Sequence, residues 1–132
     1  MEPLELLRSK IDDFPGYDTA IERRRSDEFV RSYMGEALTE MAARCTLSEE
    51  DQTRLDALVL RVAFADPRDF SVHDALAGPN DGGAVAAVDA DTLEAAERAN
   101  ALDCGAVASY LDDVTAVLDR RDSTMRAAVK LP

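Results

Sequence analysis

The 132-residue sequence has little of several residue types on which enzymatic chemistry depends. It contains one histidine, two cysteines and no tryptophan, and only 5% of its residues are aromatic. The single histidine, His73, excludes zinc and di-iron sites that need paired histidines. Asp69 lies four residues before His73, so the two could share a helix face and orient the imidazole. A contact that closes the start of a short helix is the more frequent use of such a pair.

The two cysteines are also too few and too far apart for a familiar motif. Cys45 and Cys104 form neither a Cys-x-x-Cys pair nor a secreted disulfide framework. Both fall on apolar helical stripes, which predicts reduced, buried thiols in a cytoplasmic protein. A catalytic Cys–His pair would require one of them to leave its stripe, so we do not expect a cysteine nucleophile.

Long apolar runs are missing as well. No segment approaches the roughly 20 apolar residues of a membrane span. The first residues, Met1 to Leu4, lack the basic and then apolar pattern of a secretory signal. We therefore expect a cytoplasmic protein with no membrane contact.

Positive charge is scarce, and lysine in particular occurs only twice. The chain has 27 acidic and 15 basic residues, which gives a net charge of -12. Such an excess argues against binding to nucleic acid or to anionic lipid. Caps and pairs within helices account for most of the acidic residues, which leaves a predicted surplus of unpaired aspartates on outer faces: Asp56, Asp112, Asp113 and Asp119. This surplus is compatible with adaptation to high salt or with a coding bias.

Helical periodicity is the feature that the sequence has in abundance. The chain is 46% hydrophobic, and a chain of this length can bury a core without a metal or a disulfide. No segment shows convincing period-two alternation, so we expect an all-α fold. The prediction is one domain over residues 1–132, a bundle of about four to six helices.

The first two predicted helices have clear signals. Leu4, Leu7, Ile11 and Phe14 recur at helical spacing over residues 3–13, and a Pro-Gly pair follows them. Thr19 begins a capping box, from which one long helix over residues 19–45 is expected. A break at residues 26–27 is the alternative, because both are good capping residues.

The later elements are less sharply marked. Ser48 caps a third helix that ends before Pro67, and Asp69 can cap a short helix to Leu76. Residues 78–91 read as a flexible loop, and the Asp91–Glu94 segment resembles a cap that opens a final helical region through residue 121. That region is either one kinked helix or two, and residues 123–132 form the predicted tail.

The long helix carries the favoured functional hypothesis. Its wide apolar stripe contains aromatic and methionine side chains, which adapt well to partners, although a plain core is the more common role. The predicted function is therefore non-catalytic protein interaction or homo-oligomerisation, without a cofactor. The predicted interaction face consists of Phe29, Tyr33, Met34, Leu38 and Met41.

Two alternatives remain open. Pairs of glutamates at helical spacing could face one another across the bundle and hold Mg²⁺, as in a hydrolase of a phosphoanhydride or nucleotide-like ligand. The arginine run at residues 23–25 could then meet phosphate, although an exposed ladder of ion pairs also explains it. The weak candidate metal ligands are Glu36, Glu40, Glu94 and Glu97. The other alternative is a regulatory module that binds a small apolar ligand between its helices.

Overall fold

The computed structural model describes residues 1–64 and 83–127, and over these residues the chain is helical and has no strand. In chain order the elements are α1 (Pro3–Lys10), α2 (Ala20–Arg44), α3 (Glu49–Ala63), α5 (Ala84–Arg98), η1 (Ala99–Ala101), η2 (Cys104–Ala106) and α6 (Val107–Ala127). The predicted all-α fold with one long helix is confirmed. None of these helices combines the length and hydropathy that a membrane span requires.

The long helix α2 begins and continues for local chemical reasons. The Thr19 side chain accepts a hydrogen bond from the Glu22 backbone N–H at 3.1 Å, which is the predicted cap. The helix then runs for 25 residues, or about 38 Å at the usual rise. No break occurs at Ser26 and Asp27, because both side chains make tertiary contacts instead: the Ser26 hydroxyl donates to the Gly16 carbonyl at 2.6 Å.

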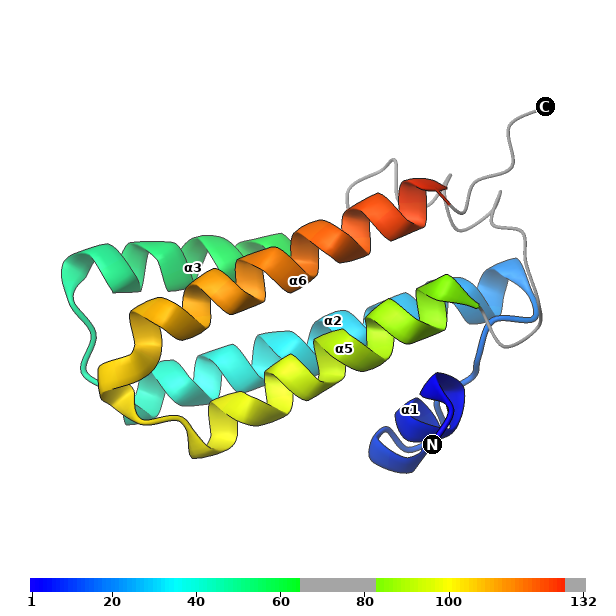
Figure 1. The fold of residues 1–132 in the computed structure, drawn as a ribbon, viewed down its shortest axis with the longest axis horizontal. Helices are drawn as coiled ribbons and strands as arrows, with labels where there is room; N and C mark the ends of the chain where they lie inside the picture. The colour runs from blue at the N-terminus through cyan, green and yellow to red at the C-terminus, as the bar shows by residue number, and fades with distance from the viewer. Residues whose placement is uncertain (65–82, 128–132) are drawn as a thin grey trace.

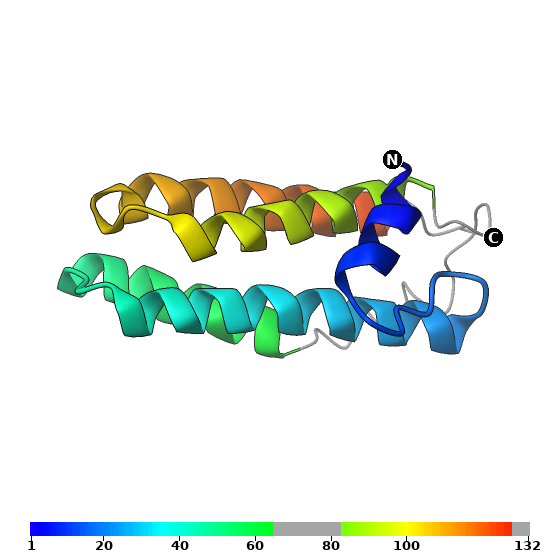
Figure 2. The same ribbon diagram turned by 90° about the horizontal axis from the view of Figure 1, so that it is seen from below.

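Four helices form the bundle as two hairpins. The α2–α3 hairpin makes one layer and the α5–α6 hairpin makes the other (Figures 1 and 2). Helix α2 packs on α5 and α3 packs on α6, so each helix has two neighbours around a common core. Leu38, Leu55 and Leu111 are at most 1% exposed in that core.

Helix α1 packs on α5 at one end of the bundle (Figure 2). Leu7, Ile11 and Phe14 are buried there, as their spacing predicts, in a second apolar cluster that also contains Leu93 of α5. The helix ends at residue 10, three residues before the predicted limit. The chain then turns through Gly16 at φ 94°, a backbone conformation that favours glycine.

The start of the final helical region was predicted incorrectly. Helix α5 begins at Ala84, so residues 84–91 of the predicted loop are helical, while residues 78–82 lie outside the described part of the chain. The apparent cap at Asp91–Glu94 lies inside the helix, where the Thr92 hydroxyl donates to the Val88 carbonyl at 2.8 Å. The apolar run at residues 84–88 is the first turn of a buried helix.

The region up to residue 121 forms two helices, one of the two arrangements that the sequence allowed. The short turns η1 and η2 separate α5 from α6 and contain Asn100 and Gly105, the residues that weaken helical propensity. Helix α6 continues to Ala127, because the buried side chains of Arg121 and Met125 anchor its last turns. The predicted tail is thus helical to residue 127. Residues 128–132 and the predicted Asp69–Leu76 helix with His73 lie outside the described residues.

Candidate functional site

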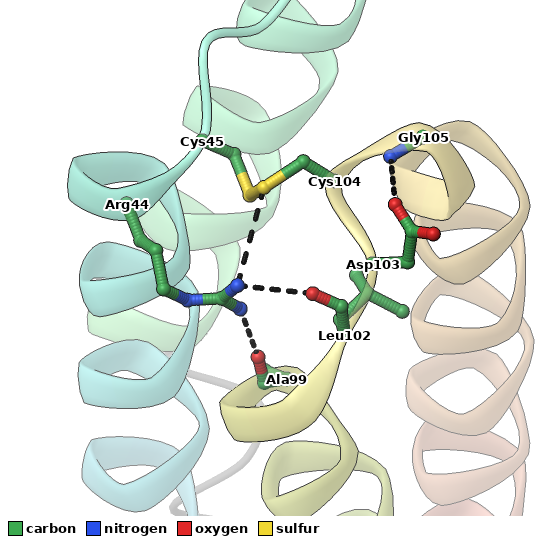
Figure 3. The surroundings of a disulfide bond; sticks show 7 residues. All are labelled: Arg44, Cys45, Ala99, Leu102, Asp103, Cys104 and Gly105. Atoms are coloured by element: carbon green, nitrogen blue, oxygen red, sulfur yellow. Dashed lines mark hydrogen bonds between the residues drawn. A yellow bond between two sulfur atoms is a disulfide. The ribbon is translucent and has the colours of Figure 1, made fainter.

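A disulfide bond overturns the prediction of reduced cysteines. The Cys45 and Cys104 sulfur atoms are 2.00 Å apart, and the two Cα atoms are 5.5 Å apart (Figure 3). Cys45 is the residue that ends α2, and Cys104 lies in the turn η2, so neither continues a helical stripe. Their separation of 59 residues gives no sequence signal of pairing. The bond links the α2–α3 hairpin to the α5–α6 hairpin.

The Arg44 side chain lies beside this disulfide and is held there by hydrogen bonds. Its guanidinium donates to the Ala99 carbonyl at 2.7 Å and to the Leu102 carbonyl at 3.0 Å. One guanidinium nitrogen also lies 3.9 Å from the Cys104 sulfur (Figure 3). Arg44 thus satisfies carbonyl groups where α5 ends.

A buried charged cluster ties the opposite end of the bundle together. Arg121 of α6 donates to Asp89 of α5 at 2.7 Å and forms a second ion pair with Asp27 of α2. The Tyr17 hydroxyl donates to the other Asp89 oxygen at 2.6 Å, and Arg31 donates to Asp27 at 2.8 Å. Two carboxylates and two guanidinium groups therefore compensate one another in this cluster.

Burial and partner charges shift the pKa values of this cluster. Burial alone would lower the pKa of Arg121, but the carboxylates of Asp89 and Asp27 outweigh it and raise the pKa. For the Tyr17 hydroxyl, in contrast, burial itself raises the pKa, and the adjacent Asp89 carboxylate raises it further. Arg121 thus remains charged and Tyr17 remains a neutral donor.

Sequence reasoning missed most of this cluster. The Asp27–Arg31 pair was expected on an exposed ladder, whereas Asp27 is only 4% exposed. Two sequence signals could have revealed the cluster. Asp89 interrupts an apolar run, and Arg121 falls between Leu118 and Met125 at core spacing.

The predicted interaction face on α2 is covered by the chain itself. Met34, Leu38 and Met41 are at most 1% exposed and belong to the core between the hairpins. Phe29 and Tyr33 are half-buried and pack against the cluster around α1. In this structure the apolar stripe of α2 therefore packs into the core, which is the common role of such a pattern.

The four candidate metal ligands do not come together. Glu36 borders a groove between α2 and α3, whereas Glu94 borders another groove between α5 and α6. Glu97 forms an ion pair with Lys10 at 3.5 Å, and Glu40 is exposed on α2. Within residues 1–64 and 83–127, no three acidic, histidine or cysteine side chains are placed to hold a metal ion.

Three of the four aspartates predicted to be unpaired form ion pairs between or along the helices. These pairs join α3 to α6 and α5 to α6, so they bridge neighbouring helices of the bundle. They are Arg54–Asp112, Arg61–Asp119, Arg61–Asp122 and Arg98–Asp113. Asp56 accepts a hydrogen bond from Gln52 at 2.9 Å. The prediction of an unpaired surplus was wrong at Asp112, Asp113 and Asp119, because sequence spacing cannot reveal pairs between helices.

The arginine run lies at the start of α2. Arg23 donates to the Tyr17 carbonyl at 3.1 Å, so it helps to hold the segment that precedes the helix. Arg25 is exposed, and Arg24 is half-buried. Arg23 is therefore part of the contact between α2 and the segment that joins α1 to α2.

A groove of about 700 Å³ lies between α2 and α3. Apolar atoms from Val59, Val62 and Ala63 of α3 line one side, and Gly35 of α2 lies opposite them. Arg31 donates to the Val62 carbonyl at 3.1 Å across the groove. The remaining lining residues are polar or acidic side chains of α2: Glu28, Ser32, Glu36 and Thr39. We call this feature the α2–α3 groove.

Two large apolar side chains at the end of α3 are exposed to solvent. Leu60 is 57% exposed and Phe64 is 71% exposed. Leu60 lies in the last turn of α3, and Phe64 is the residue at which the helix ends. Ile21, at the start of α2, is 68% exposed but has no such neighbour among the exposed large apolar residues that the structure describes.

The second groove differs in its chemistry. It lies between α5 and α6, has a volume of about 680 Å³, and is bordered by Asp91, Glu94, Arg98, Asp113 and Arg120. The Arg98–Asp113 ion pair occupies part of it. Its many charged side chains make this surface less suited to an apolar ligand than the α2–α3 groove.

No known protein family, curated protein or solved structure matches the chain. Function must therefore be argued from the geometry of the described residues. Three features stand out: the linked sulfurs beside Arg44, the buried cluster around Arg121, and the α2–α3 groove together with the exposed Leu60 and Phe64 at the end of α3.

Proposed function

We propose that this protein is a non-catalytic interaction module that binds a basic, amphipathic helix of another protein at the α2–α3 groove. The observation that supports the proposal is the exposure of Leu60 in the last turn of α3 and of Phe64 directly after it, on the helix whose Val59, Val62 and Ala63 line the groove. Partner helices that dock in grooves present apolar residues at spacings of three and four, which matches this arrangement.

The apolar contribution to such binding is substantial. Full burial of a leucine or phenylalanine side chain stabilises a contact by about 1.5–3 kcal/mol. Leu60 and Phe64 together therefore supply the central part of an interface, with the groove beside them as a receptor for one partner side chain. The groove has the volume of a small-ligand site, about 700 Å³, which suffices for a large side chain.

The charge of the chain selects the partner. Glu28 and Glu36 are exposed at the groove, and the whole chain carries a net charge of -12. The negative electrostatic potential of the chain increases the association rate of a basic partner. Two copies of the chain repel each other, so the charge opposes the homo-oligomer that the sequence also allowed.

We also propose a cytoplasmic location. A disulfide in a reducing compartment is usually reversible rather than permanent. The Cys45–Cys104 bond would then exchange with the thiols of its surroundings, and its oxidised fraction in cells, measured after rapid alkylation, would report the compartment. A bond fully oxidised in every growth condition would contradict the cytoplasmic location.

The proposed function is tested with two synthetic helical peptides that share one apolar face. One peptide carries lysine and arginine on its polar face, and the other carries glutamate. We expect fluorescence anisotropy to show binding of the basic peptide alone, weakened at least about tenfold by Phe64→Glu, because a buried charge replaces an apolar contact. Ile21→Glu is the matched control, since it adds the same charge at an equally exposed apolar position.

Three results would contradict the proposal. They are equal binding of both peptides, equal losses in Phe64→Glu and Ile21→Glu, and a homodimer in sedimentation that Phe64→Glu dissociates. The last result would assign the surface to a second copy of the chain. A monomer that binds only the basic peptide is the expected outcome.

A further inference from the structure

The two sulfurs of the disulfide differ in their access to solvent. Cys45 is only 7% exposed, whereas Cys104 lies in the exposed turn η2. A thiolate from solvent therefore has readier access to Cys104 than to Cys45, and access influences which sulfur is attacked in thiol–disulfide exchange.

The surroundings of Cys104 favour negative charge on its sulfur. The Arg44 guanidinium lies 3.9 Å from this sulfur, and its hydrogen bonds to the Ala99 and Leu102 carbonyls hold it in place (Figure 3). Cys104 also lies at the start of η2, which leads directly into the 21-residue helix α6. The positive side chain of Arg44 favours a thiolate at Cys104, and the neighbouring Asp103 carboxylate accepts a hydrogen bond from the Gly105 backbone N–H at 2.9 Å.

We propose that the Cys45–Cys104 bond is a thiol-exchange site, at which Cys104 forms a mixed disulfide with a low-molecular-mass thiol and Arg44 stabilises the Cys104 thiolate. Cys104 is the reacting residue, and Arg44 is the positioning residue. The inference is independent of the proposed binding groove.

The reaction balances with two thiols. The first thiolate attacks the Cys104 sulfur, the bond between the cysteines breaks, and Cys45 leaves with the electron pair and takes a proton from water. A second thiolate then attacks the small-molecule sulfur of the mixed disulfide, and Cys104 leaves as the thiolate beside Arg44. Overall the protein disulfide gains two electrons, and two small thiols become one small disulfide.

The opposite end of the bundle allows this exchange in the folded protein. Arg121 joins Asp27 of α2 to Asp89 of α5, so the hairpins remain connected when the sulfurs part. The cluster and the disulfide are far apart along the helices, since Asp89 lies in the first half of α5 and Arg121 in the second half of α6, whereas Cys104 lies in the turn between these two helices. Reduction is therefore expected to loosen one end of the bundle without unfolding it.

The first test is incubation of the oxidised, native protein with reduced glutathione, followed by intact mass measurement and peptide mapping. We expect one glutathione on Cys104, with circular dichroism showing that helicity is retained. Glutathione on Cys45, or reaction only after denaturant is added, would overturn the proposal and leave a purely structural bond.

The second test isolates the role of Arg44 through a pH profile. In the Cys45→Ala variant, the alkylation rate of Cys104 by iodoacetamide reports its thiolate fraction, and we expect a midpoint at least about one pH unit below the ordinary value of about 8.5. Arg44→Gln should raise this midpoint, and Arg44→Lys should restore part of the shift.

Arg54→Gln is the matched control for this profile. Arg54 is also a cation that bonds to a carbonyl and a carboxylate of α6, at Ala108 and Asp112, and it touches no sulfur in the described structure. We expect Arg54→Gln to leave the Cys104 midpoint unchanged. An equal shift in Arg44→Gln and Arg54→Gln, or no shift in either, would overturn the role of Arg44.

Discussion

Asp89 shows most clearly what single residues contribute to this fold. Its carboxylate is fully buried and accepts hydrogen bonds from Tyr17 and Arg121. A buried charge is costly in isolation, but here its partners come from a loop and from a second helix. One residue therefore fixes how three parts of the chain meet.

Replacement of this carboxylate should be far more costly than replacement of a surface one. We expect Asp89→Asn to lower the free energy of unfolding by about 3–5 kcal/mol, because Arg121 loses a buried partner. Asp112→Asn removes a surface ion pair with Arg54 and should cost less than about 1 kcal/mol. Urea unfolding of both variants measures the difference, and equal losses would show that the cluster does not carry this stability.

Tyrosine burial predicts a loss of stability at alkaline pH. Burial raises the pKa of Tyr110 from 10.0 to about 12, so the folded state holds this proton more tightly than the unfolded state does. Stability is therefore complete below pH 10 and falls as the pH rises towards 12. The midpoint of urea unfolding should therefore fall as the pH rises through this range. The Tyr110→Phe variant should show a smaller fall with pH.

Ultraviolet absorbance of the phenolate provides the check on this titration. We expect the Tyr110 phenolate to appear in the folded protein only above the normal pKa of a free tyrosine. A Tyr110→Phe variant with an unchanged alkaline slope would assign the loss to other groups, such as Tyr17.

At the scale of helices, local signals predicted some boundaries and failed at others. The Thr19 and Ser48 caps are both present, since each side chain accepts from a backbone N–H three residues on. The apparent cap at Asp91 failed because α5 buries residues on both sides of it, and tertiary burial outweighs a local preference. The disulfide could not be predicted, because it depends on how the two hairpins meet.

The disulfide should stabilise the two hairpins against each other. Chain-entropy arguments for a bond across 59 residues give about 4 kcal/mol, and measured values run at about 2–4 kcal/mol. We expect Cys45→Ala with Cys104→Ala to lower the free energy of unfolding by that amount. After treatment with a reductant, the wild-type protein should have a free energy of unfolding close to that of the double variant. If loss of the disulfide left the free energy of unfolding unchanged, the bond would not stabilise the contact between the hairpins.

At the scale of the whole molecule, the structure changes the interpretation of the acidic residues. The aspartates that sequence spacing left unpaired bridge neighbouring helices through Arg54, Arg61 and Arg98. The excess of 27 acidic over 15 basic residues remains, and it favours expansion of the folded chain at low ionic strength.

This excess predicts a salt response. We expect the free energy of unfolding to rise between low salt and about 1 M KCl, because screening relieves repulsion across the molecule more than it weakens surface pairs. Thermal unfolding at several KCl concentrations measures the effect. A flat response would attribute the acidic composition to coding bias rather than to a salt-rich environment.

The candidate site was the least predictable feature. The spacing of Met34 and Met41 correctly predicted an apolar face on α2. The same spacing is typical of a core-facing helix, and in the bundle both side chains are part of the core. Leu60 and Phe64 fall outside the buried stripe of α3, and their exposure is visible only once α3 is packed against α2 and α6. Sequence patterns identify apolar faces, while packing decides which of them stays open.

The most direct test of the proposed binding surface is backbone amide chemical-shift mapping of the labelled protein titrated with the basic amphipathic peptide. We predict that the perturbed amides lie at residues 59–64, at the end of α3, and at residues 28–39 of α2, around the α2–α3 groove. Perturbations centred on the groove between α5 and α6, around Glu94 and Arg98, would contradict it.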